Sequence, residues 1–453
     1  MVILETLDDV KEKLCSIKDV LIIPILSSNK KHPENNSISV LSISTYDNQF
    51  YIIPINHNEG KNLNLSEIEK ILSDKVIWTP DKKLLLSFFK NKSILDVNSL
   101  KYLTSNEILE KNNFLTPVHL KMDSMFSNFN VNRAIPIFKH IDFLKKYSDG
   151  CWNVINSTNL RIQTDAYKFL NDIAIPSLYL MEKSGLHVDE ELTIKKYGED
   201  IKNFIKDGLI YSQYNLFTTT GRCSNKFGKI NFAALNKKDG SRTIFDSRFE
   251  NGLLVMADFE SFHIRLIADL INYNFPTNIS IHSFLGNQYF NKTELSEEEY
   301  EESKKISFKL LYGEERRDDI PDFFKKVYLF SDKLMEDLIT TGTIQSPYFN
   351  RDIKIENIEN PHPSKLLSYL IQLAETELNL TSLQKMQALF ENSQSKAILY
   401  TYDSVLFDFS LDDGKELLIE AIKVLSHDNK FPMRIYYGKD YHNLKKLTSS
   451  LLN

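Results

Sequence analysis

Cysteine is scarce in this chain, and the sequence also lacks the usual marks of export or membrane insertion. Of its 453 residues only Cys15, Cys151 and Cys223 are cysteines. They lie far apart and without metal-site spacing, which excludes a disulfide framework and indicates a reduced, intracellular protein. The first nine residues are too acidic for a secretory signal. The longest early apolar run, residues 20–26, is short and contains Pro24, so we expect no membrane span and a cytoplasmic location.

An excess of positive charge is also missing. The chain has 55 Lys and Arg against 61 Asp and Glu, a formal net charge of −6. This balance excludes a generally basic surface for nucleic acid but permits a local basic channel. The length and a hydrophobic content of 42% are sufficient for two or three packed domains.

The order of apolar and polar segments predicts a multidomain chain of mixed α/β and α+β class. The early segments are typical of three short strands, at residues 19–26, 37–44 and 50–55. An amphipathic pattern predicts a helix from Thr164 to about Ser184 that tolerates a kink near Pro176. A further helix is expected from Glu190 to about Asp207.

Two aspartates are the strongest candidates for chemistry. Asp258 stands at the polar end of an apolar run, Leu253–Ala257, which predicts a buried strand. Asp403, in the segment Tyr400–Ser404, is expected at a similar strand end. Two strand-borne carboxylates suit two-metal phosphoryl transfer, in which paired divalent ions clamp the attacking and leaving oxygens.

Further candidates lie around these aspartates. The loop Thr218–Ser224 contains Arg222 and is followed by Arg242; arginines in such a loop can grip a phosphate backbone. Lys304, Phe308 and Tyr312 are spaced four residues apart, which places a lysine for phosphates beside aromatics that can stack on a base. The last candidates are Arg351, at the end of segment 342–351, Gln372 on the helix that follows, and Tyr402.

In this order, the motifs of residues 164–446 resemble the polymerase module of family A DNA polymerases. The N-terminal third is similar, more faintly, to the 3′–5′ exonuclease domain of that family. The resemblance implies the following domains: 1–125 exonuclease-like, 126–163 connector, 164–217 reduced thumb and palm entry, 218–282 palm with the first aspartate, 283–345 fingers, and 346–453 palm with the second aspartate and C-terminal segment.

The resemblance also implies a function. The chain is expected to be a DNA-directed DNA polymerase, a nucleotidyltransferase of DNA replication that adds dNTPs to the primer end of primer–template DNA. Asp258, Asp403 and the carbonyl of Phe259 would hold two Mg²⁺ ions, with Mn²⁺ as a substitute. His263, Lys304, Phe308 and Tyr312 would bind the nucleotide. The residues implied in nucleic-acid binding are Arg222, Arg242, Arg351, Gln372 and Tyr402, with Arg265 as a buttress of the palm.

Three departures from the family pattern leave alternatives open. His263 stands where a glutamate that excludes ribonucleotides is usual, Tyr300 where an arginine is usual, and Ser404 where a second acid is usual. Besides an active polymerase, the sequence therefore allows a catalytically silent scaffold that binds primer–template. It also allows an enzyme with relaxed sugar choice that accepts rNTPs.

Two further regions are reduced relative to the family. The first strand of the exonuclease-like domain carries no acid over residues 21–27, and Asp81 and Asp96 alone could not hold its metals, which predicts an inactive exonuclease. Fewer than 30 residues lie between the segment Gly185–Asp189 and Thr218, where a long thumb is usual, which implies low processivity or a processivity or replisome partner. The compact layout and the Lys- and Asn-rich composition suggest a viral or mobile-element enzyme, working in the host cytoplasm if viral.

Overall fold

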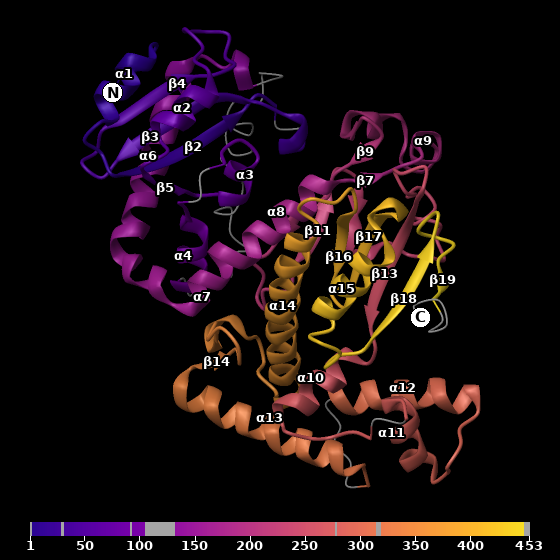
Figure 1. Cartoon of the computed structure of the whole chain (residues 1–453). Helices are drawn as coiled ribbons and strands as arrows, with labels where there is room; N and C mark the ends of the chain where they lie inside the picture. Colours follow the sequence, from indigo (N-terminus) through magenta and orange to yellow (C-terminus); the bar gives the residue numbers. More distant parts are fainter. Residues whose placement is uncertain are drawn as a thin grey trace.

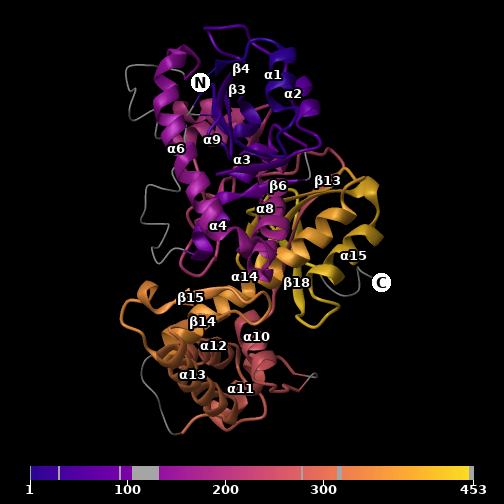
Figure 2. The ribbon, with the colours of Figure 1, turned by 90° about the vertical axis from the view of Figure 1, so that its left-hand side faces the viewer.

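The computed structural model describes residues 2–28, 31–90, 93–104, 132–276, 279–313 and 319–447. It contains three packed units (Figure 1). The N-terminal unit is built on a six-stranded sheet, the central unit on a five-stranded sheet, and the third unit is mainly helical. Figure 2 shows the helical unit below both sheets after a quarter turn. The mixed α/β and α+β multidomain class is confirmed.

The N-terminal sheet has the order β1-β4-β3-β2-β5-β6. Its strands are β1 (Val2–Ile3), β2 (Asp19–Leu26), β3 (Ile38–Thr45), β4 (Phe50–Pro54), β5 (Val76–Thr79) and β6 (Ile94–Asp96). The strands β2, β3 and β4 are antiparallel and confirm the three predicted strands, whereas β5 and β6 run parallel to β2. Both faces of the sheet are covered by helices, which explains why β2 and β4 are apolar runs rather than alternating patterns.

Strand β2 shows how the two faces are used. Side chains alternate along a strand, so Ile22 packs into one core with α1 (Leu7–Leu14) and α2 (Leu65–Ile71). Its neighbours Leu21 and Ile23 pack into the other core, with α4 (Val97–Thr104) and α6 (Ile137–Thr158). Helix α3 (Lys82–Leu86) adjoins the next unit through α8.

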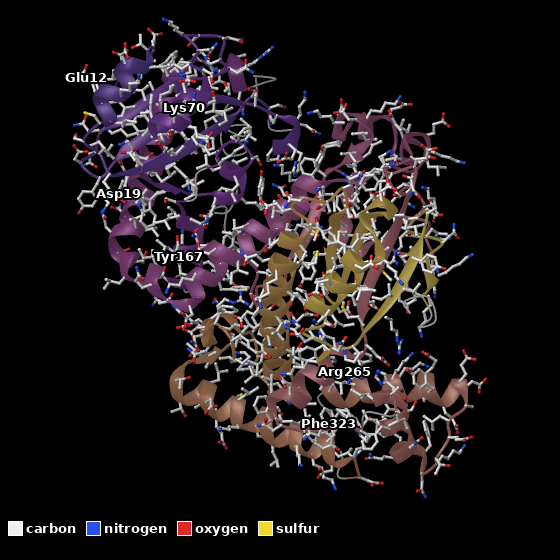
Figure 3. All side chains as sticks on the ribbon, viewed as in Figure 1. Glu12, Asp19, Lys70, Tyr167, Arg265 and Phe323 are labelled. Atoms are coloured by element: carbon white, nitrogen blue, oxygen red, sulfur yellow. The ribbon has the colours of Figure 1, made fainter. Side chains whose placement is uncertain are left out.

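The connection to the central unit is helical but irregular. It consists of α7 (Asp165–Lys168), a π-helical turn (Phe169–Ala174) and α8 (Ile175–Ser184). Pro176 has no N–H for the helical ladder, which accounts for the wider turn just before it. Tyr167, which is labelled in Figure 3, lies on this connection. Its hydroxyl donates to the carbonyl of Asp96 at 3.2 Å and ties the connection to the N-terminal unit.

The predicted helix from Glu190 to Asp207 is wrong in length. Helix α9 (Glu190–Tyr197) ends at Gly198, whose φ of +87° is a conformation that glycine adopts without strain. A 3₁₀ segment (Glu199–Phe204) follows. The chain then forms a small sheet of β7 (Leu186–His187), β9 (Leu209–Ile210) and β8 (Ile205–Lys206).

The central sheet has the order β16-β17-β13-β18-β19. Its strands are β13 (Gly252–Phe259), β16 (Lys396–Thr401), β17 (Ser404–Ser410), β18 (Met433–Gly438) and β19 (Lys445–Lys446). The middle strand β13 is antiparallel to both neighbours. Its Val255 and Ala257 pack in one core with α8, α14 (Pro363–Leu389) and α15 (Lys415–Leu425), and Leu254 packs into the core on the opposite face.

The third unit contains four helices and a two-stranded sheet among its described residues. They are α10 (Phe262–Leu270), α11 (Ile281–Phe290), α12 (Glu297–Tyr312), α13 (Asp322–Thr341), β14 (Thr343–Gln345) and β15 (Asp352–Lys354). A core that includes Leu311 and Phe323 joins these helices to Ile371 of α14 (Figure 3). Within the described part of the chain, none of the helices is both long and apolar enough to cross a membrane.

Candidate active site

The two aspartates lie next to each other at the end of the central sheet. Asp258 is near the end of β13 and pairs in register with Ser404 of β17. The N–H of Phe259 donates to the carbonyl of Asp403 at 3.0 Å, which fixes the backbones of the two segments together. The phenyl ring of Phe259 stacks on Phe262 at 4.1 Å and packs into the core of the helical unit.

Asp403 does not lie on a strand, contrary to the prediction. It occupies the two-residue turn between β16 and β17, which are paired through Thr401 and Ser404. Tyr402 precedes it with a φ of +55°, a left-handed conformation that is costly for a bulky residue and that ends the strand. The side chain of Asn379 on α14 donates to the Tyr402 carbonyl at 2.8 Å and supports this turn.

Both aspartates resist ionisation. Burial, followed by repulsion from Asp403, raises the pKa of Asp258 from 3.8 to about 6, while Arg434 and Arg242 oppose the rise. Burial, followed by repulsion from Glu375, raises the pKa of Asp403 as well. A divalent cation would relieve this repulsion, so the pair favours cation binding.

The donor set fits Mg²⁺ as an ion that is only partly held by protein. Mg²⁺ prefers oxygen ligands and often keeps one or two carboxylates together with waters and substrate phosphates. Asp258 and Asp403 supply two carboxylates, and within the described ranges no group of three or more His, Cys, Asp or Glu side chains is placed to hold a metal. The pair therefore suits an ion that also binds a phosphate-bearing substrate.

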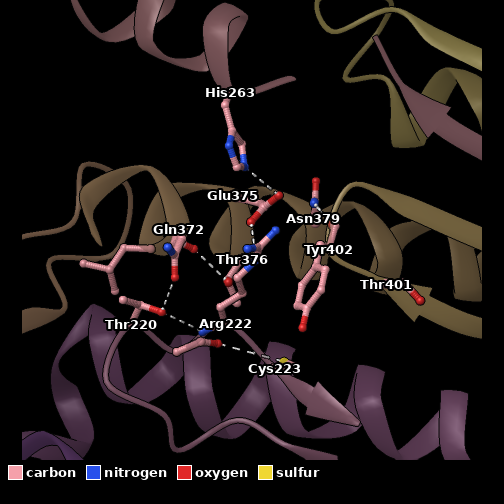
Figure 4. Close-up of polar contacts among 12 residues, drawn as sticks. Thr220, Arg222, Cys223, His263, Gln372, Glu375, Thr376, Asn379, Thr401 and Tyr402 are labelled. Carbon is pink, nitrogen blue, oxygen red and sulfur yellow. Dashed lines mark hydrogen bonds and ion pairs between the residues drawn. The ribbon is translucent and has the colours of Figure 1, made fainter. Parts of the chain in front are cut away.

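A buried glutamate links two of the predicted residues. Glu375 on α14 is fully buried, and its two oxygens lie 3.1 Å from Nε2 of His263 and 3.0 Å from Nε of Arg222 (Figure 4). The guanidinium of Arg222 also stacks on the Tyr402 ring at 3.8 Å. A buried carboxylate requires compensation by cations or donors, so Glu375 holds both side chains in place.

The structure brings the predicted helix face into contact with His263. Tyr312, at the end of α12, hydrogen-bonds to Nδ1 of His263, and Phe308 stacks beside Tyr312 at 6.2 Å while remaining half exposed. Lys304, on the same face, contacts Glu301 at 2.5 Å and lies 4.5 Å from the ring of Tyr300. The nucleotide-binding candidates therefore form a continuous row from His263 to Lys304.

The remaining candidates have varied surroundings. Arg222 lies just before β11 (Ser224–Phe227), in a loop whose Thr220 hydroxyl donates to the Gln372 side-chain carbonyl at 2.9 Å (Figure 4). Arg242 stacks over Tyr441 at 4.4 Å. Arg265 donates through Nε to the carbonyl of Glu260 at 2.9 Å.

The place of Arg351 differs from the expectation of a nucleic-acid contact. Its side chain is 1% exposed and pairs with Glu377 of α14 at 2.6 Å, with its guanidinium 4.9 Å from the Phe169 ring. The guanidinium also packs directly against Gly221. Its burial argues against direct contact with nucleic acid, because exposure would break a buried ion pair. Arg351 is instead placed to support the loop that carries Arg222.

The comparisons with known proteins identify the fold. No family model matches the sequence, and no curated protein matches it significantly. Among solved structures, the chain is similar to the POL domain of Pol1 from M. smegmatis, in complex with DNA primer-template and dNTP. The TM-score is 0.74 and the identity 13%, covering 98% of this chain and 100% of that chain. The chain has the fold of a DNA polymerase POL domain.

Sequence reasoning missed two residues of this POL-like site. Glu375 follows Gln372 by three positions and precedes Asn379 by four, so the three lie along one side of a helix that is largely buried. That spacing was visible in the sequence and would have indicated a buried polar network. Arg434 of β18 lies directly opposite Asp258 in the pairing of β18 with β13, and only the strand register shows this.

Proposed function

We propose that this chain is a template-directed DNA polymerase of family A that adds dNTPs to a primer 3′-hydroxyl. The adjacency of Asp258 and Asp403 is the observation that carries the proposal. The row from His263 to Lys304 beside them offers a cation and aromatic surfaces to a nucleotide. The similar POL domain was solved with primer-template and dNTP, which supports the same partners for this chain.

The domain assignment follows the same proposal. The central sheet corresponds to the palm, the helices α11 to α13 to the fingers, and the short segments before Thr218 to a reduced thumb. The only regular α-helix described between Gly185 and Thr218 is α9, with eight residues. So small an element would grip duplex DNA weakly, which supports low processivity or a partner protein.

The proposed reaction is in-line attack of the primer 3′-hydroxyl on the α-phosphorus, with pyrophosphate as the leaving group. Asp258, Asp403 and the carbonyl of Phe259 would hold two Mg²⁺ ions. When bound, such ions neutralise negative charge on the attacking and leaving oxygens. Lys304 would contact the triphosphate, and its present partner Glu301 is 58% exposed, so that contact exchanges readily.

The primer end would meet Arg222. This side chain is 28% exposed, and its orientation is set by Glu375 on one side and Tyr402 on the other. A pre-oriented guanidinium loses little conformational entropy when it binds the primer terminus, which favours accurate placement of the 3′-hydroxyl. Gln372 and Arg242 would contact the template or the primer more peripherally.

His263 would lie near the sugar of the incoming nucleotide. Its ring is clamped between Tyr312 and Glu375, so it forms a fixed wall rather than a mobile side chain. We propose that this wall restricts the space at the sugar 2′ position. Comparison of dNTP with rNTP incorporation measures the restriction, and equal use of both would contradict it.

The exonuclease-like unit would serve as a scaffold. Asp81 caps α3 by accepting from the N–H of Leu84 at 2.9 Å, and the buried Asp96 accepts from the N–H groups of Lys82 and Ser99. Both acids are thus used in local structure. We expect the purified chain not to trim a mismatched primer; Mg²⁺-dependent 3′–5′ trimming would overturn this assignment.

Primer extension tests the proposed activity. The wild-type chain, with Mg²⁺ and dNTPs, should extend a primer, and Asp258→Asn or Asp403→Asn should reduce the rate by roughly 10³-fold or more because the metal ligands act as a unit. Asp337→Asn, an exposed acid on α13, is the matched control and should extend normally. Primer–template binding without any turnover would instead identify the chain as a silent scaffold.

A further inference from the structure

Arg434 is placed beside the first aspartate by the sheet itself. It lies on β18 directly opposite Asp258 of β13, and residues paired in this way share one face of a sheet. The side chain of Arg434 is 31% exposed, and its Nη2 donates to Oε1 of Glu260 at 2.8 Å. A partly exposed cation therefore stands next to the carboxylate pair.

The same guanidinium reaches the helical unit. The guanidinium of Arg434 lies near the side chain of Tyr300 on α12, an interaction that helps to raise the pKa of Arg434, and the ammonium of Lys304 lies 4.5 Å from the ring of Tyr300. Figure 1 shows α12 passing below the end of β18. Tyr300 thus stands between a cation from the sheet and a cation from the helix.

A neighbouring histidine is near both cations. Burial, followed by the charges of Lys304 and Arg434, lowers the pKa of His282 to about 4. His282 is itself buried and packs edge-on against Tyr300. The two positive charges therefore act on one small volume beside Asp258, although they come from different units of the fold.

We propose that Arg434 binds the triphosphate of the incoming nucleotide together with Lys304, and that Tyr300 holds the two cations side by side. This inference rests on the proposed polymerase function and deepens it. A polyphosphate needs several cations at once, and a guanidinium binds two phosphate oxygens through parallel hydrogen bonds. Arg434 comes from the sheet that carries Asp258, so it would also align the phosphates with the reacting end.

The present partners of the two cations can be exchanged for phosphate. Glu301 is 58% exposed, so water screens its ion pair with Lys304. Glu260 is 23% exposed and binds Arg434 more firmly, so a triphosphate has to compete with that carboxylate for the guanidinium. A triphosphate carries more charge than either carboxylate and can accept from both cations together. Binding would then replace two separate pairs by one shared anion.

The test compares Arg434→Met with Arg434→Lys and Tyr300→Phe in the full-length chain. Lys445→Met on β19 is the matched control, because it removes one positive charge from an exposed residue of the same sheet. Single-nucleotide extension gives KM and kcat for the dNTP, and pyrophosphate inhibition reports the phosphate site. Equilibrium dNTP binding to a chain-terminated primer–template complex gives a readout that is independent of turnover.

Arg434→Met should raise KM and weaken both dNTP binding and pyrophosphate inhibition by roughly 10- to 100-fold, as expected for a charged hydrogen bond. Arg434→Lys should recover part of the loss. Tyr300→Phe should cost only about threefold to fivefold, because it removes one hydroxyl beside Arg434 and leaves both cations in place. Lys445→Met should leave all three quantities unchanged. If Arg434→Met and Arg434→Lys both extend primers with unchanged KM and pyrophosphate inhibition, the inference is wrong; if the wild type does not extend primers, the proposed function is wrong.

Discussion

Asp258 should make the folded protein less stable at neutral pH, because the fold holds its carboxyl in surroundings that oppose ionisation. The pKa of this carboxyl is about 6 in the folded chain against an ordinary value of 3.8. The folded state therefore binds a proton more tightly than the unfolded state. As pH rises from about 4 to about 6, stability should fall, and above the folded pKa the whole cost is present.

The magnitude follows from the shift. A rise of roughly two pKa units corresponds to at most about 3 kcal/mol. Asp258 is only partly buried, so solvent screening reduces the cost to about 1 kcal/mol. Asp258→Asn keeps the shape of the side chain and removes the charge. It should therefore stabilise the protein by about 1 kcal/mol near pH 8 and by almost nothing near pH 4.

Urea unfolding in EDTA, followed at both pH values, measures this difference. The comparison needs the wild type, Asp258→Asn and the surface control Asp337→Asn, which should match the wild type at both pH values. Adding Mg²⁺ should stabilise the wild type more than Asp258→Asn, because the ion binds the ionised carboxylate of the folded state. An equal shift at both pH values, or a loss of stability in Asp258→Asn near pH 8, would refute the reasoning.

Two further predictions concern the loop and the sugar wall. Gly221→Ala should lower stability by about 2 kcal/mol, because φ is +70° and the new methyl group would collide with the buried Arg351 guanidinium; an unchanged thermal midpoint would contradict this. His263→Glu should slow primer extension about tenfold or more, because it places a second carboxylate against buried Glu375. Adding Glu375→Gln to the same chain removes that repulsion and should restore part of the rate. The single variant His263→Glu is then compared with the double variant that also carries Glu375→Gln. If the two have the same rate and the same rNTP-to-dNTP ratio, the His263–Glu375 contact has no role.

Local patterns were sufficient to predict much of the fold. The strands β2 to β4 were predictable because each is a short segment rich in β-branched and other apolar residues between polar segments. Their boundaries differ from the predicted ones by no more than one residue. The strand with Asp258 and the helix with Lys304 followed from the same reasoning. The helix from Glu190 was predicted too long because the breaking effect of Gly198 was overlooked.

The details of the site depended on contacts between distant segments. The burial of Arg351 by Glu377 and Phe169 cannot be seen in a local pattern, since an arginine after a turn usually reaches solvent. The pairing of Arg434 with Asp258 depends on the register of two strands that lie more than 170 residues apart in the chain. A shift of one residue would have turned Arg434 to the opposite face.

Helix α14 explains how a largely buried element can organise a polar site. It is buried on most of its surface, yet Gln372, Glu375, Glu377 and Asn379 all lie along it. Gln372 binds the loop before β11, and Glu375 binds His263 on the first helix after β13. Glu377 binds Arg351, and Asn379 binds the turn before β17. Buried charges are costly unless they are paired, so a displaced segment would leave its partner on α14 without compensation. The helix therefore favours one arrangement of Arg222, His263 and Asp403 over others, which is the rigidity that positioning chemistry requires.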